Sequence, residues 1–207
     1  MTSLNINQLV LGMLRTNCYI VYNENNEAVI IDPADNYSKI KEKITTLKLS
    51  PVAILLTHGH FDHIGAAMKL KDNYGIKIYA HELEKEILES ASYNLSEVFG
   101  IGMAIRADEY FKDGDVLNFC DFDFKIIHTP GHTEGSVCFY LEAYNTLFSG
   151  DTLFLESHGR TDFPTGSEAA IINSITKKLF LLPKATKVFA GHNGETAIAD
   201  EMKWYRY

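Results

Sequence analysis

A nine-residue stretch of this chain carries three histidines and an aspartate within six positions, and few folds accommodate such a cluster. The stretch reads Thr57-His58-Gly59-His60-Phe61-Asp62-His63-Ile64-Gly65. An apolar run at 52–56, which predicts a buried strand, comes directly before it. A pattern typical of a helix follows it. The four ligand-type side chains therefore stand where a strand ends and a helix begins.

The spacing of these four residues indicates a metal site. In an extended segment His58 and His60 point to the same side, and Gly59 between them lets the backbone pass close to what they hold. Asp62 and His63 fall at the start of the helix, where the helix dipole favours an acidic residue. Imidazole and carboxylate groups bind zinc, iron or manganese. A solvated polar loop is the alternative, and this density of ligand types disfavours it.

Three further predicted strands each end in a glycine turn that carries one potential ligand. The turns are His128-Thr129-Pro130-Gly131-His132-Thr133, Ser149-Gly150-Asp151-Thr152 and Gly191-His192-Asn193-Gly194. They add His132, Asp151 and His192 to the first four ligand candidates. Seven exceed the three or four that one zinc takes, so we predict two metals that share a carboxylate. Alone, Asp151 could be a helix cap and His192 a turn residue, but their joint position at strand ends argues against coincidence.

The hydrophobic pattern predicts strands separated by helices in two halves. We expect strands at 6–11, 18–22, 28–31, 52–56, 77–80, 115–119, 122–128, 136–141, 145–149 and 187–190. We expect helices at about 36–47, 63–73, 81–88, 167–180 and 195–204. This order indicates two packed sheets with helices outside. Residues 90–107 are either a lid over the site or an irregular segment that packs on the core.

Composition limits the partners and the cellular location. The formal charge of −8 argues against a polyanion such as nucleic acid. The cysteines Cys18, Cys120 and Cys138 lie in apolar surroundings without CxxC spacing, so we expect reduced core residues in a cytoplasmic protein. We see no signal peptide and no apolar stretch of membrane-span length. We therefore expect a small-molecule substrate, with neither nucleic acid nor membrane as partner.

Two single residues each allow two interpretations. Asp32 ends a predicted strand before Pro33, and it is either a functional carboxylate or a turn former. His81 begins a predicted helix, and we expect a surface or cap histidine rather than a ligand.

Together the motifs resemble those of the metallo-β-lactamase superfamily, and within it the glyoxalase II-like (hydroxyacylglutathione hydrolase-like) branch. Asn17-Cys18-Tyr19 and Ile31-Asp32-Pro33 also match, so the resemblance covers nearly the whole chain. It implies an α/β fold, a four-layer αββα sandwich with the metals at the sheet edges. By position, it implies that one metal is held by His58, His60 and His132 and the other by Asp62, His63 and His192, with Asp151 bridging them. β-Lactamases of the superfamily usually have Cys or Ser in place of this aspartate and most are exported, and its nucleases carry extra RNA-binding segments, so neither pattern fits.

The resemblance implies a metal-dependent hydrolase with two divalent ions, zinc being expected and iron or manganese the alternatives. A metal-bridged hydroxide would attack the carbonyl carbon of a thioester, S-lactoylglutathione or a related hydroxyacyl thioester. Asp62 is the candidate catalytic residue that orients the water. Arg160 takes the position of a basic glutathione contact and is the candidate substrate-binding residue, with an ion pair to Asp162 as the alternative. His158 is either a pocket or a surface residue, and His128 either supports a ligand residue from behind or has a structural role.

The chain departs from full-length glyoxalase II in one respect. It stops about fifteen residues after His192, so we expect a single domain over 1–207 without the C-terminal helical domain. Residues 90–107, or a second copy in a homodimer, are the candidates for completing the pocket. A mononuclear-iron persulfide dioxygenase and a lactonase or other esterase are the alternative activities. Seven ligand candidates argue against a non-catalytic, metal-stabilised domain.

Overall fold

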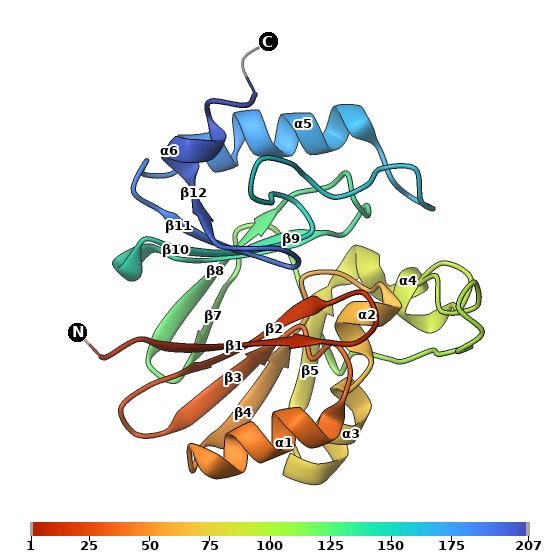
Figure 1. Cartoon of the computed structure of the whole chain (residues 1–207), viewed down its shortest axis with the longest axis vertical. Helices are drawn as coiled ribbons and strands as arrows, with labels where there is room; N and C mark the ends of the chain where they lie inside the picture. Colours follow the sequence, from red (N-terminus) through yellow and green to blue (C-terminus); the bar gives the residue numbers. More distant parts are fainter. Residues whose placement is uncertain (1, 206–207) are drawn as a thin grey trace.

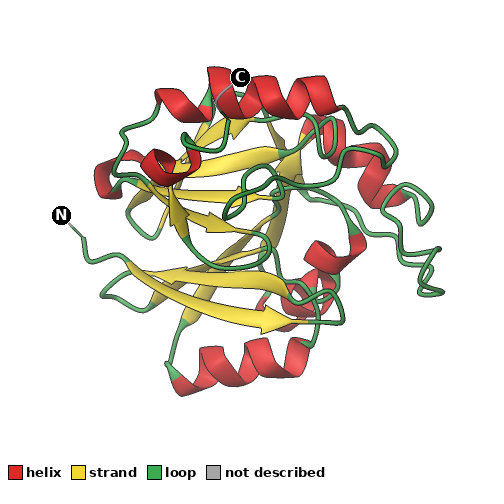
Figure 2. Ribbon diagram, turned by 45° about the horizontal axis from the view of Figure 1, so that its top comes forward, coloured by secondary structure: helices red, strands yellow, loops and turns green. Residues whose placement is uncertain are grey.

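The protein consists of two six-stranded sheets packed face to face, with helices on both outer surfaces (Figures 1 and 2). The computed structural model describes residues 2–205. Helices α1 and α3 cover one sheet, and α5 and α6 cover the other (Figure 1). The four-layer αββα sandwich is therefore confirmed.

The first sheet is built from the N-terminal half of the chain, in the order β1-β2-β3-β4-β5-β6. Its strands are β1 (Asn5–Leu11), β2 (Thr16–Tyr22), β3 (Glu27–Ile31), β4 (Ser50–Leu55), β5 (Lys77–His81) and β6 (Glu109–Phe111). Its helices are α1 (Tyr37–Thr46), α2 (Phe61–Ile64), α3 (Ala67–Tyr74), η1 (Glu82–Glu84) and α4 (Lys85–Glu89). Strands β1 to β3 pair antiparallel, whereas β3 to β6 pair parallel through helical crossovers. The parallel strands therefore end at one edge of the sheet.

The second sheet is built from the C-terminal half, in the order β12-β11-β10-β9-β8-β7. Its strands are β7 (Val116–Phe119), β8 (Phe122–His128), β9 (Val137–Leu141), β10 (Thr146–Gly150), β11 (Lys187–Ala190) and β12 (Thr196–Ala197). Its helices are η2 (Glu142–Tyr144), α5 (Glu168–Lys177), η3 (Leu179–Leu181) and α6 (Ile198–Glu201). Only β10 and β11 pair parallel, so the loops that follow both strands lie at the same edge.

Alternation along the strands separates the core into layers. In β2, Tyr19 and Val21 face the second sheet, whereas Cys18 and Ile20 pack with residues of α1 and α3. Successive side chains of a strand point to opposite faces, so strands covered on both sides are apolar throughout. A third cluster, which includes Ile171 of α5, fills the space between the second sheet and its helices.

The predicted strands are all present, and the structure adds two that the pattern did not indicate. These are β6 and β12, which are short, and each is an edge strand of its sheet. Residues 90–107 have no regular structure, as predicted. All three cysteines are buried and free, also as predicted. Among the described residues, no helix has the length and apolar character needed to cross a membrane.

The single helix predicted over 63–73 is wrong, because the chain forms α2 and α3 with a break at Gly65. A Cβ at Gly65 would lie 2.2 Å from the carbonyl oxygen of Ala34, so the backbones are in close contact there. The N–H of Ala66 donates to the carbonyl of Pro33 at 2.8 Å. A tertiary contact with the loop after β3 therefore interrupts the helix.

His81 is a cap, which confirms one of its two predicted roles, and it is buried rather than on the surface. Its Nδ1 accepts a hydrogen bond from the N–H of Leu83 at 3.4 Å, and the residue is only 3% exposed. The ring stacks on His128 with centroids 4.4 Å apart. The Nε2 of His128 lies 2.7 Å from the carbonyl oxygen of Glu134, so His128 braces the loop after β8.

Candidate metal centre

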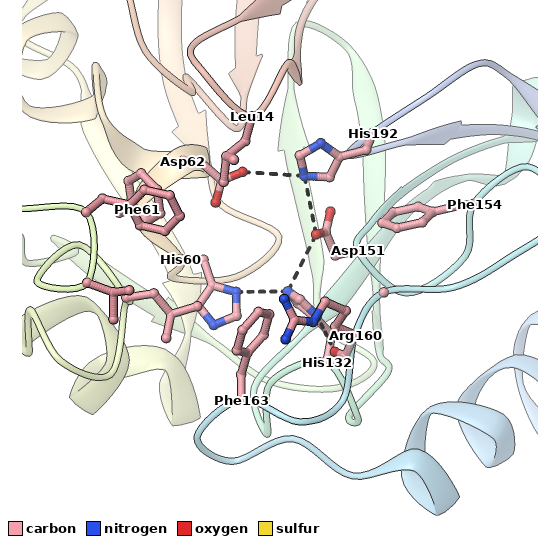
Figure 3. Close-up of a pocket in the computed structure, with 14 residues that line it drawn as sticks. Leu14, His60, Phe61, Asp62, His132, Asp151, Phe154, Arg160, Phe163 and His192 are labelled. Atoms are coloured by element: carbon pink, nitrogen blue, oxygen red, sulfur yellow. Dashed lines mark hydrogen bonds and ion pairs between the residues drawn. The ribbon is translucent and has the colours of Figure 1, made fainter.

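Loops from both sheets converge at one edge of the sandwich and bring all seven predicted ligands together. His58, His60, Asp62 and His63 follow β4, whereas His132, Asp151 and His192 follow β8, β10 and β11. Figure 3 shows five of these side chains pointing toward one another around a common centre. Their role as metal ligands stays a prediction, which the following geometry supports.

Three groups of three side chains each bring their ligand atoms close together; Asp32, His58 and His63 form one that was not predicted, and the other two match the predicted sets. The first predicted group is His58, His60 and His132, and the second is Asp62, His63 and His192; within each group the ligand atoms lie within 4.8 Å of one another. In the first group, Nδ1 of His60 lies 2.8 Å from Nε2 of His132. In the second, Oδ2 of Asp62 lies 3.4 Å from Nε2 of His192. These are the sets that the family resemblance implied.

Asp151 lies between the two groups. Its Oδ2 is 3.5 Å from Nε2 of His132 in the first group and 3.5 Å from Nε2 of His192 in the second. Its Oδ1 is 3.4 Å from Nε2 of His63. One carboxylate therefore reaches both groups, which is what a bridging ligand requires. It occupies this place because β10 ends at Gly150 beside β11.

Several buried atoms at this centre have no hydrogen-bond partner. They are Nε2 of His58, Nε2 of His60, Nε2 of His63 and Oδ1 of Asp151. Buried polar atoms in folded proteins are almost always partnered, so these four atoms are available to bind a cation. Histidine nitrogens and carboxylate oxygens are ligands of zinc, iron and manganese. The residues present therefore fit divalent metal ions.

The electrostatics of the two groups differ. Burial, reinforced by the neighbouring histidines, lowers the pKa of His58 well below its usual value and that of His60 to about 3. Burial also lowers the pKa of His63, but the charges of Asp62, Asp151 and Asp32 outweigh it and hold this pKa well above the usual range. His58 and His60 are thus neutral, the form that binds metal, whereas His63 lies among three carboxylates.

Asp32 contacts the side of His63 that faces away from the other ligands. This contact favours a functional carboxylate over a turn former. Its Oδ2 lies 2.9 Å from Nδ1 of His63, and the residue is 2% exposed. It accepts hydrogen bonds from the N–H and hydroxyl of Thr57, at 2.8 and 2.6 Å. A carboxylate on the far nitrogen of a ligand histidine fixes its tautomer and raises its basicity.

Two other contacts orient ligands, and no sequence motif indicated them. The hydroxyl of Thr16 donates to Oδ2 of Asp62 at 2.6 Å. Nδ1 of His132 lies 2.7 Å from the carbonyl oxygen of Arg160. Both partners are distant in sequence from the ligand they hold, so only the folded chain reveals them.

Glu84 is the most informative residue that sequence reasoning missed. It lies in η1, is fully buried, and accepts hydrogen bonds from the N–H of Gly59 at 2.6 Å and the hydroxyl of Thr133 at 2.5 Å. It thereby ties the loop of His58 and His60 to the loop of His132. Burial raises its pKa to about 7, against the hydrogen bonds from Thr133, Gly59 and Gly135 that favour the ionised form. In sequence it is one glutamate among several charged residues, so no signal distinguishes it.

A cavity of about 600 Å³ opens above the metal centre (Figure 3). His60, Asp62, His132, Asp151 and His192 all line it, so a bound molecule would touch the predicted ligands. Its size lies within the range of small-molecule sites, about 300–1,000 Å³.

The predicted substrate contacts differ in their placement. Arg160 lines the cavity but is held by Asp162 through two hydrogen bonds of 2.9 and 2.6 Å, so both of its readings find support. His158 is absent from the cavity lining and contacts Tyr205 and Glu168.

Residues 90–107 have two roles. Leu95, Val98 and Phe99 line the cavity, whereas Ile105 and Ala107 belong to the core. The segment is therefore both a wall of the site and a packing element.

Comparisons with known proteins agree with this geometry. The sequence matches the family model described as the metallo-beta-lactamase superfamily over residues 11–192. It is 36% identical over 204 residues to hydroxyacylglutathione hydrolase GloC of Haemophilus influenzae, covering 97% of this chain and 96% of that protein. It is 37% identical over 197 residues to the probable metallo-hydrolase YqgX of Bacillus subtilis, covering 94% and 93%.

Solved structures with similar folds include two of more than 30% identity. The structure of BLEG-1 B3 metallo-beta-lactamase is 39% identical, with a TM-score of 0.93 and coverage of 96% of this chain and 97% of that chain. The structure of TTHA1623 in a di-iron-bound form is 34% identical, with a TM-score of 0.86 and coverage of 95% and 97%.

Proposed function

The chain belongs to the metallo-beta-lactamase superfamily, and we propose that within it this protein hydrolyses thioesters of small hydroxy acids, such as S-lactoylglutathione. The observation that carries the proposal is the position of Asp151, which contacts both ligand groups beneath an open cavity. The name of the Haemophilus influenzae relative, a hydroxyacylglutathione hydrolase, supports the choice of substrate class.

The residues of the chain have separable tasks in this reaction. When bound, a pair of divalent cations supplies Lewis acidity for the carbonyl oxygen and lowers the pKa of water. The carboxylate of Asp62 lines the cavity, and the hydroxyl of Thr16 fixes one of its oxygens. We propose that Asp62 accepts a hydrogen bond from the attacking water and so orients it. The apolar cavity walls limit access of other water.

The identity and number of the metals belong to the proposal. Two complete groups of three ligands, joined by Asp151, support two divalent ions per chain. Zinc suits this donor set, and the di-iron form of TTHA1623 makes iron the main alternative. Elemental analysis of the purified protein distinguishes these cases. One iron per chain with consumption of oxygen would instead favour a persulfide dioxygenase.

A β-lactam substrate is a second candidate, favoured by the 39% identity to BLEG-1, which is described as a B3 metallo-beta-lactamase. This similarity weakens the argument against β-lactamase activity that was based on Asp151 and on the export of most such enzymes. A direct assay with a β-lactam compares the two activities in one preparation.

The deciding assay is hydrolysis of S-D-lactoylglutathione by purified, metal-replete protein. We expect turnover that is lost in His58→Ala, because this change removes one ligand of the first group. Absence of hydrolysis with every lactoyl thioester, while both metals are bound, would refute the proposal.

We also propose a cytoplasmic location, a homodimer, and the absence of nucleic acid or membrane partners.

A further inference from the structure

The walls of the cavity above the metal centre are apolar. Large apolar side chains form them, and besides Phe61 of α2 these are Leu14, Leu95, Val98, Phe99, Phe154 and Phe163. Except for Phe61, they come from the β1–β2 turn, the 90–107 segment and the loop after β10. Figure 3 shows Leu14, Phe154 and Phe163 on different sides of the ligand cluster. A molecule that reaches the metals therefore passes between apolar surfaces.

Part of this apolar wall is exposed to solvent. Val98 is 78% exposed, Phe99 44% and Leu14 41%, and Met13 and Ile101 beside them are 65% and 44% exposed. A contiguous group of exposed apolar side chains marks a surface that binds something. Leu14, Val98 and Phe99 of this group also line the cavity, so a molecule held there would contact them.

Hydrogen bonds and a ring contact hold the 90–107 segment in the conformation that places these side chains at the cavity. The hydroxyl of Ser96 accepts a hydrogen bond from the N–H of Met103 at 2.9 Å and donates to its carbonyl at 3.0 Å. The N–H of Phe61 donates to the carbonyl of Asn94 at 2.9 Å, and the rings of Phe61 and Phe99 lie 4.7 Å apart. The apolar wall is thus fixed to the loop that carries the metal ligands.

Positive charge is scarce around the cavity. In the described part of the chain, Arg160 is the only lysine or arginine that lines it. Asp162 binds its guanidinium through two hydrogen bonds, and the same group lies 4.3 Å above the ring of Phe163. Glutathione carries carboxylates and an ammonium group, and burying such charges without partners is unfavourable. The wall is therefore a poor match for glutathione.

We infer that the thiol half of the natural substrate is apolar, an alkyl or aryl thiol that packs against Leu14, Val98 and Phe99. The inference rests on the proposed hydrolysis of hydroxyacyl thioesters and names their thiol half. A hydroxyacyl group is small, so the thiol half fills most of the cavity of about 600 Å³. S-D-lactoylglutathione is then hydrolysed, but its glutathione half gains no favourable contact with the apolar side chains of the cavity.

The first test compares two thioesters that share the lactoyl group and the scissile bond. We expect kcat/KM to be at least about tenfold higher for S-D-lactoyl-2-phenylethanethiol than for S-D-lactoylglutathione, because each buried methylene contributes about fourfold. The double variant Val98→Ser/Phe99→Ser should reduce this ratio toward unity. Val98 is 78% exposed and Phe99 44%, and neither belongs to a core cluster, so a thermal unfolding curve close to that of the wild type should accompany this change. Leu181→Ser makes the same kind of change at a 78% exposed residue of η3 outside the cavity lining, and it should leave the ratio unchanged.

The second test measures binding and does not require turnover. Calorimetric titration of the metal-loaded protein with 2-phenylethanethiol and with glutathione should show at least about tenfold tighter binding of the aryl thiol. Val98→Ser/Phe99→Ser should remove that preference. If neither thioester is hydrolysed, the proposed function fails. The two thiol affinities still show whether the cavity prefers an apolar thiol to glutathione.

Two results would overturn the inference. The first is glutathione binding as tightly as the aryl thiol. The second is a preference for the aryl thiol that Val98→Ser/Phe99→Ser leaves unchanged. If sedimentation then shows a dimer for the wild-type protein and a monomer for this variant, the exposed apolar group is a contact between two copies of the chain rather than a substrate wall.

Discussion

Replacement of Glu84 by glutamine isolates the energetic effect of a buried carboxyl that links the two ligand loops. Glu84 is fully buried, and burial raises its pKa from the usual 4.5 to about 7. Between these two values the folded protein keeps a proton that the unfolded chain releases. The free energy of unfolding therefore decreases as the pH rises through this window. Glutamine has nearly the same shape and does not titrate.

The size of the effect follows from the shift. Each pKa unit corresponds to about 1.4 kcal/mol, so a shift from 4.5 to about 7 amounts to about 3 kcal/mol. We expect Glu84→Gln to gain about 3 kcal/mol of stability relative to the wild-type protein between pH 4.5 and pH 7. The two proteins should differ least at the acidic end, because both side chains are neutral there.

Urea unfolding of the chelator-treated proteins at several pH values measures this difference. The histidines and aspartates of the metal centre titrate equally in both proteins, so they cancel in the comparison. Glu86→Gln is the matched control, since Glu86 is an exposed glutamate just after η1. A Glu84→Gln difference that changes by less than about 1 kcal/mol over the window would show that the carboxyl titrates normally.

Three changes at the metal centre have expected outcomes of their own. Asp151→Ala should lose bound metal and activity together, and full activity at normal metal content would show that this residue does not bridge. Asp32→Asn weakens the partner of His63, so metal affinity in chelator competition should fall about 10- to 100-fold; an unchanged affinity would make Asp32 a turn former. Gly191→Ala would place a Cβ 2.2 Å from Oδ1 of Asp151 and should lower the metal content, whereas Gly194→Ala, whose nearest atom is 3.9 Å away, should not. Equal metal contents in the two glycine variants would contradict the close packing.

The architecture was predictable because its signals are local. Apolar strands with a period of two, and helices between them, depend on residues close in sequence. The same holds for the position of each ligand candidate, because a glycine turn after an apolar strand places a side chain at the sheet edge. The structure accordingly brings together His58, His132, Asp151 and the four others.

Long-range contacts explain both the wrongly predicted helix and the burial of His81. The helix expected over 63–73 breaks because Gly65 meets the backbone of Ala34, a residue from another loop. His81 lies inside the protein because its ring stacks on His128, which belongs to the other sheet. Neither partner is visible from the local pattern.

The sequence by itself determined ten of the twelve strands, most of the helices and the identity of the seven ligand candidates, since periodicity and turn chemistry act over a few residues. Only the tertiary structure decided which side chains support those ligands and what surrounds them. Glu84 joins two ligand loops, Asp162 occupies Arg160, and Phe99 reaches the cavity wall. Burial and the pairing of charges depend on residues far apart in the chain, and these contacts exist only once the two sheets have packed together.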